Sequence, residues 1–198
     1  MVKAIFDRMA ALLGIIILSP LLVVITLSVI IDSPGSPFFV QVRVGKKARL
    51  FGLFKFRTMK PFSEKEGKLT IGARDPRITR VGYILRKYKL DELPQLFNVL
   101  LGHMSVVGPR PEVPEYVSHY DKVQLRVLEV KPGITDYASL SYFTESEMLA
   151  KSSDPRKTYL EEIMPAKLAL NLEYISRRSF AEDMRIIGKT IQRIALTR

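Results

Sequence analysis

Cysteine is absent from this chain of 198 residues, and histidine occurs only twice. Without cysteine the protein can have no disulfide framework, no thiolate metal site and no cysteine nucleophile. His103 and His119 lack the spacing of metal ligands, so we interpret both as structural or surface residues. The sequence also contains no internal repeat, no P-loop and no Gly-x-Gly-x-x-Gly motif. These absences exclude several common classes of metal-binding, redox and nucleotide-binding protein.

Acidic residues are too few to balance the basic ones. The chain has 31 lysines and arginines against 20 aspartates and glutamates, which gives a formal net charge of +11. Such an excess indicates a polyanionic partner. Nucleic acid, anionic lipid and phosphorylated small molecules all meet this requirement, and charge alone does not choose among them. The length suits one domain with short appendages.

The segment from Ala10 to Ile31 contains no charged residue and predicts attachment to a membrane. It exceeds the roughly 20 residues that a helix needs to cross a bilayer. It is long for a signal peptide, and the residues after it offer no convincing cleavage site. Ser19-Pro20 in its middle predicts a kink, because proline removes one helical hydrogen bond and clashes with the preceding turn. Basic residues flank both ends, so the pattern leaves a spanning helix and a re-entrant helix equally open.

The next segment predicts a small β-hairpin within a mostly helical α+β fold. After the turn-rich residues 32–37, the segment Val40–Val44 alternates like a strand, and Gly45-Lys46-Lys47 can turn it into a second strand over 50–57. Phe54 and Phe56 face one side of this second strand, and Lys55 and Arg57 face the other. That basic face either holds phosphates or is simply solvated.

Asp91 and Glu92 are the strongest candidates for reactive groups. They precede an apolar set with helical spacing, Leu93, Leu96, Phe97, Leu100 and Leu101. Asp91 is a good N-cap and Gly102 a good stop, so we expect both carboxylates at the positive end of a helix, a place that also favours phosphate. The simpler interpretation is that Asp91 only caps the helix and Glu92 only complements its dipole.

Several predicted segments bring cations toward this pair. An amphipathic helix marked by Ile78, Val81, Leu85 and Tyr88 carries Arg86, and it follows a polar segment, Lys60–Arg77, that we predict to be a mobile loop. Pro109 and Pro111 leave Arg110 little backbone freedom to lose on binding phosphate, unless the segment is merely a rigid connector. Lys131 lies in a predicted turn, 131–136.

Two further helices are predicted toward the C-terminus. Tyr116, Val117, Tyr120, Val123 and Val127 mark the first. The second follows a capping box at Ser179–Glu182 and has an apolar face made by Phe180, Met184, Ile187, Ile191 and Ile194. Basic residues oppose this face, so the helix either lies on an anionic membrane surface or packs on its own domain.

Four motifs taken together resemble those of a known enzyme family. They are Lys55-Phe56-Arg57-Thr58-Met59, the stretch 90–100 around Asp91-Glu92-Leu93-Pro94, the stretch 104–111 ending in Pro109-Arg110-Pro111, and Lys131-Pro132-Gly133-Ile134-Thr135. In this order and spacing they resemble the bacterial sugar transferases, and more narrowly the small monotopic phosphoglycosyl transferases, a class that includes the Campylobacter enzyme that starts N-glycan assembly. The resemblance covers nearly the whole chain.

The resemblance implies a membrane enzyme that moves a phospho-sugar from a UDP-sugar to polyprenol (undecaprenyl) phosphate and releases UMP. It implies that Ser19-Pro20 makes the apolar helix re-entrant. Residues 1–37 would then be a membrane helix with its linker. Residues 38–198 would be a catalytic domain at the cytoplasmic face of the bacterial inner membrane, with interfacial helices around the N-terminus of a catalytic helix. A membrane-attached basic protein that binds lipid or nucleic acid without catalysis is the alternative, although the paired acids speak against a nucleic-acid partner.

The resemblance also implies roles for individual residues. Asp91 would be the nucleophile, would form a covalent phospho-sugar intermediate and would help to coordinate Mg²⁺. Glu92 would take a proton from the lipid phosphate. Arg86 and Arg110 would handle phosphate, and Asp183 matches a further acidic position. Two departures are visible: His103 stands where many members have aspartate, and residues 136–140 lack an Asn-Gly-Arg that follows in many members. Lys131 is our candidate to replace that arginine, and the sugar stays undetermined.

Overall fold

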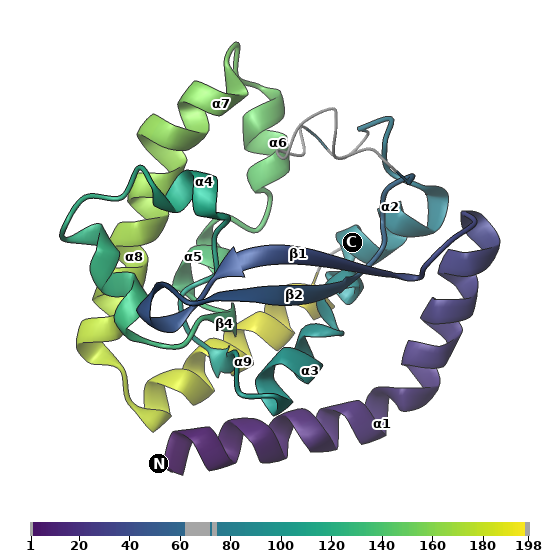
Figure 1. Ribbon diagram of the computed structural model, residues 1–198, viewed down its shortest axis with the longest axis horizontal. Coiled ribbons are helices and arrows are strands. Elements are labelled where there is room, and N and C mark those ends of the chain that lie inside the picture. The colour runs from purple at the N-terminus through teal and green to yellow at the C-terminus, as the bar shows by residue number, and fades with distance from the viewer. Residues whose placement is uncertain (1, 62–71, 73–74, 197–198) are drawn as a thin grey trace.

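The computed structural model describes residues 2–61, 72 and 75–196. Most of the predicted loop Lys60–Arg77 lies outside these residues. Helices make up most of the fold, with a two-stranded antiparallel sheet and a two-stranded parallel sheet (Figure 1). The first half contains α1 Val2–Asp32, β1 Phe38–Val44, η1 Lys46–Ala48, β2 Leu50–Phe56, α2 Arg80–Lys87, η3 Leu90–Glu92, α3 Gln95–Leu100 and β3 Ser105–Val107. The second half contains α4 Pro114–Val117, η4 Gln124–Glu129, β4 Gly133–Thr135, α5 Tyr137–Ser141, α6 Glu145–Ala150, α7 Pro155–Thr158, η5 Tyr159–Ile163, α8 Met164–Arg177 and α9 Phe180–Ala195.

The apolar N-terminal run forms the long helix α1, with Pro20 inside it. Figure 1 shows the helix changing direction partway along its length. Its first half packs on α3, where Ala11 meets Leu96 and Val99, and its second half packs through Ile25 on the hairpin and α2. Only 11% of its most apolar stretch is buried, which is unlike the core helix of a soluble domain.

Both ends of α1 are attached to the same body by polar contacts. Near the N-terminus, Lys3 Nζ lies 2.5 Å from Asp183 on α9, and buried Asp7 accepts a hydrogen bond of 2.7 Å from Ser105 Oγ on β3. At the other end, Asp32 accepts a hydrogen bond of 2.9 Å from the Val81 N–H in the first turn of α2. Arg57 then donates to the Ser33 and Pro34 carbonyls that follow α1. Both ends of α1 are therefore fixed to the same domain by polar contacts.

The predicted hairpin is confirmed, with strand ends within two residues of expectation. Phe38 pairs with Phe56 and Val44 with Leu50 in an uninterrupted antiparallel register. The outer edge of β2 is closed by a side chain: Asn98 of α3 accepts from the Phe54 N–H at 2.9 Å and donates to the Gly52 carbonyl at 2.7 Å. A buried amide thus replaces a third strand, because backbone groups buried without partners are costly.

Helix α3 buries its predicted apolar stripe only in part: Leu93, Leu96 and Leu100 pack against the core. Its buried residues are Gln95, Asn98 and Val99, whereas Phe97 and Leu101 of the predicted apolar stripe are exposed. The amide of Asn98 must face the hairpin, so part of the apolar stripe is directed outward beside α1. Gly102 adopts a positive φ of 83°, which confirms the predicted stop.

Two predictions in the middle of the chain were wrong. The predicted helix over 116–127 is broken into α4 and η4, because Asp121 Oδ1 accepts hydrogen bonds from the N–H groups of Val123 and Gln124 and so starts a new turn. The predicted turn at 131–136 contains strand β4, which pairs in parallel with β3. A side chain on Gly133 would lie 2.1 Å from the Gly108 nitrogen, so both neighbouring motifs need glycine for this approach.

The C-terminal helix begins as predicted but buries a different face. Ser179 caps α9 by accepting a hydrogen bond from the Glu182 N–H. Ile186, outside the predicted apolar set, is completely buried, whereas Phe180 and Ile191 are 55% and 64% exposed. The ring of Phe180 instead meets Phe6 of α1 edge to face at 5.0 Å. The predicted apolar face is therefore only partly the packing face.

Candidate active site

The turn that carries Asp91 and Glu92 is fixed by the segment before it. Thr79 caps α2 by accepting from the Gly82 N–H, and α2 lies so close to β2's end that a side chain on Gly82 would come within 2.1 Å of the Thr58 carbonyl oxygen. Lys89 then adopts a left-handed conformation, φ 56°, which ends α2 and begins the 3₁₀ turn η3. Both carboxylates lie in η3. The prediction that Asp91 caps the catalytic helix was wrong, because the N-cap of α3 is Pro94.

The carboxylates open onto the large cavity of the described part of the molecule, which has a volume of about 800 Å³. Its walls come from the hairpin, α2, η3, the segment after β3, α5, α6 and α9. Lysines and arginines of the lining are Arg43, Lys55, Arg86, Lys87, Lys89, Arg110, Lys167 and Arg193. The cavity is therefore suited to an anion larger than a single phosphate.

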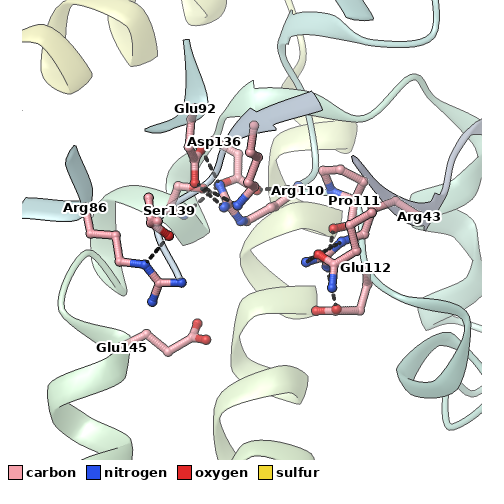
Figure 2. A network of polar contacts seen from close by, with 12 residues as sticks. Arg43, Arg86, Glu92, Arg110, Pro111, Glu112, Asp136, Ser139 and Glu145 are labelled. Carbon is pink, nitrogen blue, oxygen red and sulfur yellow. Dashed lines mark hydrogen bonds and ion pairs between the residues drawn. The ribbon is translucent and has the colours of Figure 1, made fainter. Parts of the chain in front are cut away.

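Glu92 is bound by two cations. Its carboxylate forms a bidentate pair with the Arg110 guanidinium, in which Nη1 lies 2.9 Å from Oε2 and Nη2 also contacts Oε1 (Figure 2). Lys55 Nζ lies 3.5 Å from Oε1. Burial alone would raise the pKa of Glu92, but Arg110 and Lys55 outweigh it and hold that pKa well below its usual value. The same pairing raises the pKa of Arg110.

The pKa of Asp91 is shifted in the opposite direction to that of Glu92. It is 7% exposed, and its Oδ1 has no hydrogen-bond partner among the described residues. Burial raises the pKa of Asp91; adjacent Glu92 adds to this effect, while Lys55, Arg86 and Lys89 oppose it. A buried carboxylate oxygen without a partner is uncommon in folded proteins and is typical of a functional site. Asp91 is therefore the group of this pair left to act on a ligand.

The cations around Asp91 are held from other elements. Arg86 donates from Nε to Thr58 Oγ1 at 2.8 Å, so the Lys55–Met59 motif positions a residue of α2. The Arg110 backbone N–H donates to Asp136 at 3.0 Å, and the other oxygen of Asp136 caps α5 through the Ser139 N–H. Burial lowers the pKa of Lys55, and it also lowers that of Lys89. The buried charges of Lys55 and Lys89 therefore gain from binding an anion.

The structure gathers some of the predicted site residues and separates others. Asp91, Glu92, Lys55, Arg86 and Arg110 all line the cavity. Arg57, Lys131 and Asp183 are not among its lining residues: Arg57 holds the segment after α1, and Lys131 lies near Arg8 and Gly102. Asp183 is buried between Lys3 and the Tyr174 hydroxyl, which donates to it at 2.6 Å. Ser19 and Pro20 lie inside α1 and are also not among the cavity's lining residues.

Sequence reasoning missed a second charged cluster in the cavity wall. Arg43 of β1 pairs with Glu112 at 2.9 Å and donates to the Pro111 carbonyl (Figure 2). The Tyr159 hydroxyl donates to the same glutamate, and Lys167 pairs with Glu145 at 2.6 Å. These residues come from four separate segments without a shared motif, so only the alternation of β1, which places Arg43 opposite its apolar neighbours, gave any local signal.

The residues present fit a magnesium ion only as part of a complex with substrate. Among the described residues no group of three or more histidines, aspartates or glutamates could hold a metal. Mg²⁺ commonly uses one or two carboxylates together with substrate phosphates and waters. Asp91, with its unpaired buried oxygen, is the carboxylate that fits this role, since Glu92 is bound to Arg110 and Lys55.

Comparison with known proteins identifies the family of this chain. A model described as bacterial sugar transferase matches residues 1–197. The chain belongs to this family. A UDP-glucose:undecaprenyl-phosphate glucose-1-phosphate transferase of Xanthomonas campestris pv. campestris is 38% identical over 97% of this chain. A UDP-N-acetylgalactosamine-undecaprenyl-phosphate N-acetylgalactosaminephosphotransferase of Aeromonas hydrophila is 36% identical over 98% of it.

The family includes relatives of different length. The chain spans 38% and 43% of the length of those two transferases. By contrast, it spans 92% of the exopolysaccharide production protein PSS of Rhizobium leguminosarum bv. phaseoli, to which it is 35% identical over 96% of this chain. The matched region, which is nearly the whole of this chain, is thus the part that these relatives share with it.

The opposite pKa shifts predict opposite effects of neutralising the two carboxylates. Since the pKa of Asp91 is raised, its charge destabilises the folded state above its ordinary pKa, and that cost disappears as the pH falls below it. Asp91→Asn should therefore raise the Tm at pH 7.5, by an amount that shrinks toward pH 4. The pKa of Glu92 is lowered, so its charge stabilises the fold above its ordinary pKa.

Glu92→Gln should lower stability on the order of 2–4 kcal/mol, because Arg110 keeps a buried charge without its partner. Glu115→Gln is the matched control: it removes an exposed pair with Arg156 and should cost no more than about 0.5 kcal/mol. Thermal unfolding in one detergent measures the Tm of Asp91→Asn at pH 7.5 and at pH 4, and denaturant unfolding at pH 7.5 in that detergent measures the free energies of all three variants. Equal destabilisation by Asp91→Asn and Glu92→Gln would contradict the assigned electrostatics.

Proposed function

We propose that this protein transfers a phospho-sugar from a UDP-sugar to polyprenol phosphate, releases UMP, and does so in two displacements through Asp91. The observation that carries the proposal is the difference between the two carboxylates of η3. Glu92 is paired with Arg110 and Lys55, whereas the neighbouring Asp91 has a buried oxygen without a hydrogen-bond partner among the described residues, in a basic cavity. The curated names of the relatives supply the reaction class, and the diphosphate of a UDP-sugar matches the size and charge of the cavity.

In the first displacement an Asp91 oxygen attacks the β-phosphorus of the UDP-sugar. A carboxylate–phosphorus bond forms, the bond from that phosphorus to the bridging oxygen breaks, and UMP leaves with its electron pair. Phosphoryl transfer needs in-line positioning and charge neutralisation more than proton chemistry. Lys55, Arg86 and Lys89, which oppose the raised pKa of Asp91, are placed to neutralise the diphosphate. When bound, Mg²⁺ would offset phosphate charge and stabilise the leaving UMP.

In the second displacement an oxygen of the lipid phosphate attacks the same phosphorus and frees the Asp91 carboxylate. Glu92 is the proposed acceptor of any proton on that lipid phosphate. Its low pKa makes it a weak base while Arg110 holds it. We therefore infer that the incoming lipid phosphate binds the Arg110 guanidinium and so breaks its pair with Glu92. Without this cation the pKa of Glu92 rises, and Glu92 becomes a stronger base at the step that needs one.

Membrane attachment is proposed to be re-entrant and confined to the cytoplasmic face. Lys3 and Asp7 at one end of α1, and Asp32 at the other, all contact the same domain. A straight helix across the bilayer would have to separate these ends by about 30 Å of hydrocarbon. The exposed apolar residues of α1, together with Phe97 and Leu101 of α3, would then face lipid. This arrangement would put the cavity where lipid phosphate and soluble nucleotide sugar meet.

The test of the reaction is release of UMP from a panel of UDP-sugars with and without undecaprenyl phosphate. We expect at least one sugar to give catalytic release that depends on the lipid, and Asp91→Asn to reduce turnover by about a hundredfold or more. Catalytic release of UMP without the lipid would indicate a hydrolase instead. Binding of bulk polyanions with no release of UMP would favour the non-catalytic alternative.

The separate roles of the two acids predict a split between the half-reactions. In Glu92→Gln, the first displacement should survive, with about one UMP released per enzyme in a rapid burst, because Asp91 remains. Transfer to the lipid should fall by about tenfold or more, since the proton acceptor is lost. Rapid-quench measurement of UMP and of lipid product follows both steps. Equal losses in both steps would contradict this assignment.

The topology predicts a labelling pattern that the cysteine-free sequence makes easy to read. Val2→Cys and Ser36→Cys introduce thiols at exposed positions on either side of the apolar run. A membrane-impermeant thiol reagent should modify both in inverted vesicles and neither in intact spheroplasts. Modification of the two positions from opposite sides would show a spanning helix and overturn the re-entrant arrangement.

A further inference from the structure

Two cations from distant parts of the chain meet beside the turn that ends α3. Arg8 belongs to the first half of α1, and Lys131 lies just before β4. A side chain built on Gly102 would come within 2.9 Å of Arg8 Nη2 and would lie 3.6 Å from Lys131 Nζ. Because both nitrogens lie so close to one point, they are near enough to each other to contact a single phosphate group together.

Neither of these two charges is neutralised within the described part of the chain. Among those residues, Arg8 and Lys131 form no hydrogen bond and no ion pair. Asp7, which precedes Arg8, is buried and accepts instead from the Ser105 hydroxyl and the Val106 N–H. Burial lowers the pKa of Lys131, and the charge of Arg8 lowers it further, by more than Asp7 raises it. An anion bound between the two cations therefore relieves their repulsion.

The end of α3 does not by itself account for the two cations. Basic side chains often complement the last turn of a helix. Helix α3, however, has only six residues, and the carbonyls of Phe97, Asn98 and Val99 already accept backbone N–H groups. Neither cation lines the cavity that contains Asp91, so the substrates proposed to react there are not the anions that they fit. An acceptor outside the protein is required.

The surface around this pair is apolar and exposed. Leu101 lies in the same turn as Gly102, and the part of α1 that carries Arg8 also exposes Ile5, Met9 and Leu12. Lysine and arginine side chains at the border of a lipid-facing surface extend their charged ends to the headgroups. Such cations are attracted to anionic lipids of the cytoplasmic leaflet. The apolar surface and the paired charges together fit a phospholipid.

We propose that Arg8 and Lys131 form a binding site for the headgroup phosphate of an anionic phospholipid, at the border of the membrane-facing surface. The inference rests on the membrane attachment in the proposed function, and it adds a bound lipid that is distinct from both substrates. The guanidinium binds two phosphate oxygens, and the ammonium binds a third as a point charge. The lipid thereby links α1 to the segment that leads into β4.

The test uses the absence of tryptophan from the chain. Leu101→Trp places a single fluorescent reporter at the exposed position next to Gly102. The protein is reconstituted in vesicles of phosphatidylcholine and phosphatidylglycerol, in which one lipid or the other carries brominated acyl chains that quench tryptophan on contact. We expect phosphatidylglycerol to be preferred about tenfold over its bulk fraction at this position. Arg8→Gln combined with Lys131→Gln should reduce the preference to about twofold or less, whereas Arg8→Lys combined with Lys131→Arg should keep most of it.

Lys151→Gln combined with Lys157→Gln is the matched control. It removes two exposed cations near α6 and α7, which lie across the hairpin from α1 (Figure 1), and it should leave the preference unchanged. No preference in the Leu101→Trp protein, or one that survives Arg8→Gln with Lys131→Gln, would overturn the site. Displacement of the brominated phosphatidylglycerol by an equal amount of undecaprenyl phosphate, or by inorganic phosphate, would overturn the choice of ligand.

The quenching measurement needs no turnover. A protein that never released UMP would therefore fail the proposed function, while the lipid preference still judged this site. If neither brominated lipid quenched the reporter, the membrane-facing surface and the lipid site would both be wrong.

Discussion

The burial of two adjacent carboxylates in one short turn is the constraint on which the rest of the structure depends. Two ionised acids in a poorly solvated place repel each other, so the fold must supply cations from several directions. Lys55 comes from the hairpin, Arg86 from α2 and Arg110 from the segment after β3. The supply is unequal, because Glu92 takes Arg110 and Lys55 while an oxygen of Asp91 is left without a partner. That inequality distinguishes a group that organises the site from one that can react.

The contacts between the surrounding elements hold these cations in place around the turn. Asn98 fastens α3 to the edge of β2, and the Gly108–Gly133 contact brings the segment with Arg110 beside β4. Helix α1 holds the other side through contacts at both of its ends. In the proposed orientation, the same helix that anchors the protein in lipid also supports the strand and helices that carry the cations, so attachment and catalysis share one scaffold.

The sequence was informative where a local pattern decides structure, and it failed where tertiary contacts decide it. The hairpin follows alternation and turn residues, and the start of α9 follows the hydrogen-bonding ability of Ser179, so both were predictable. The orientation of α3 was not fully predictable, because Asn98 is a polar residue that one expects to be exposed. Only the folded structure shows that its amide pairs with the edge of β2. Arg57 and Arg86 show the same limit: both are predicted phosphate-binding residues, yet Arg57 donates to carbonyls after α1, whereas the charge of Arg86 lowers the pKa of Asp91. Arg8 and Lys131, remote from each other in sequence, gave no local signal of meeting beside Gly102.

The central claim is that Asp91 becomes covalently bonded to phosphorus during turnover. Intact-protein mass spectrometry after mixing the wild-type enzyme with its UDP-sugar, in the absence of lipid phosphate, tests this claim most directly. Our account predicts a mass increase of one sugar phosphate, absent in Asp91→Asn and discharged when undecaprenyl phosphate is added. An unchanged mass under conditions in which the complete reaction proceeds would contradict it.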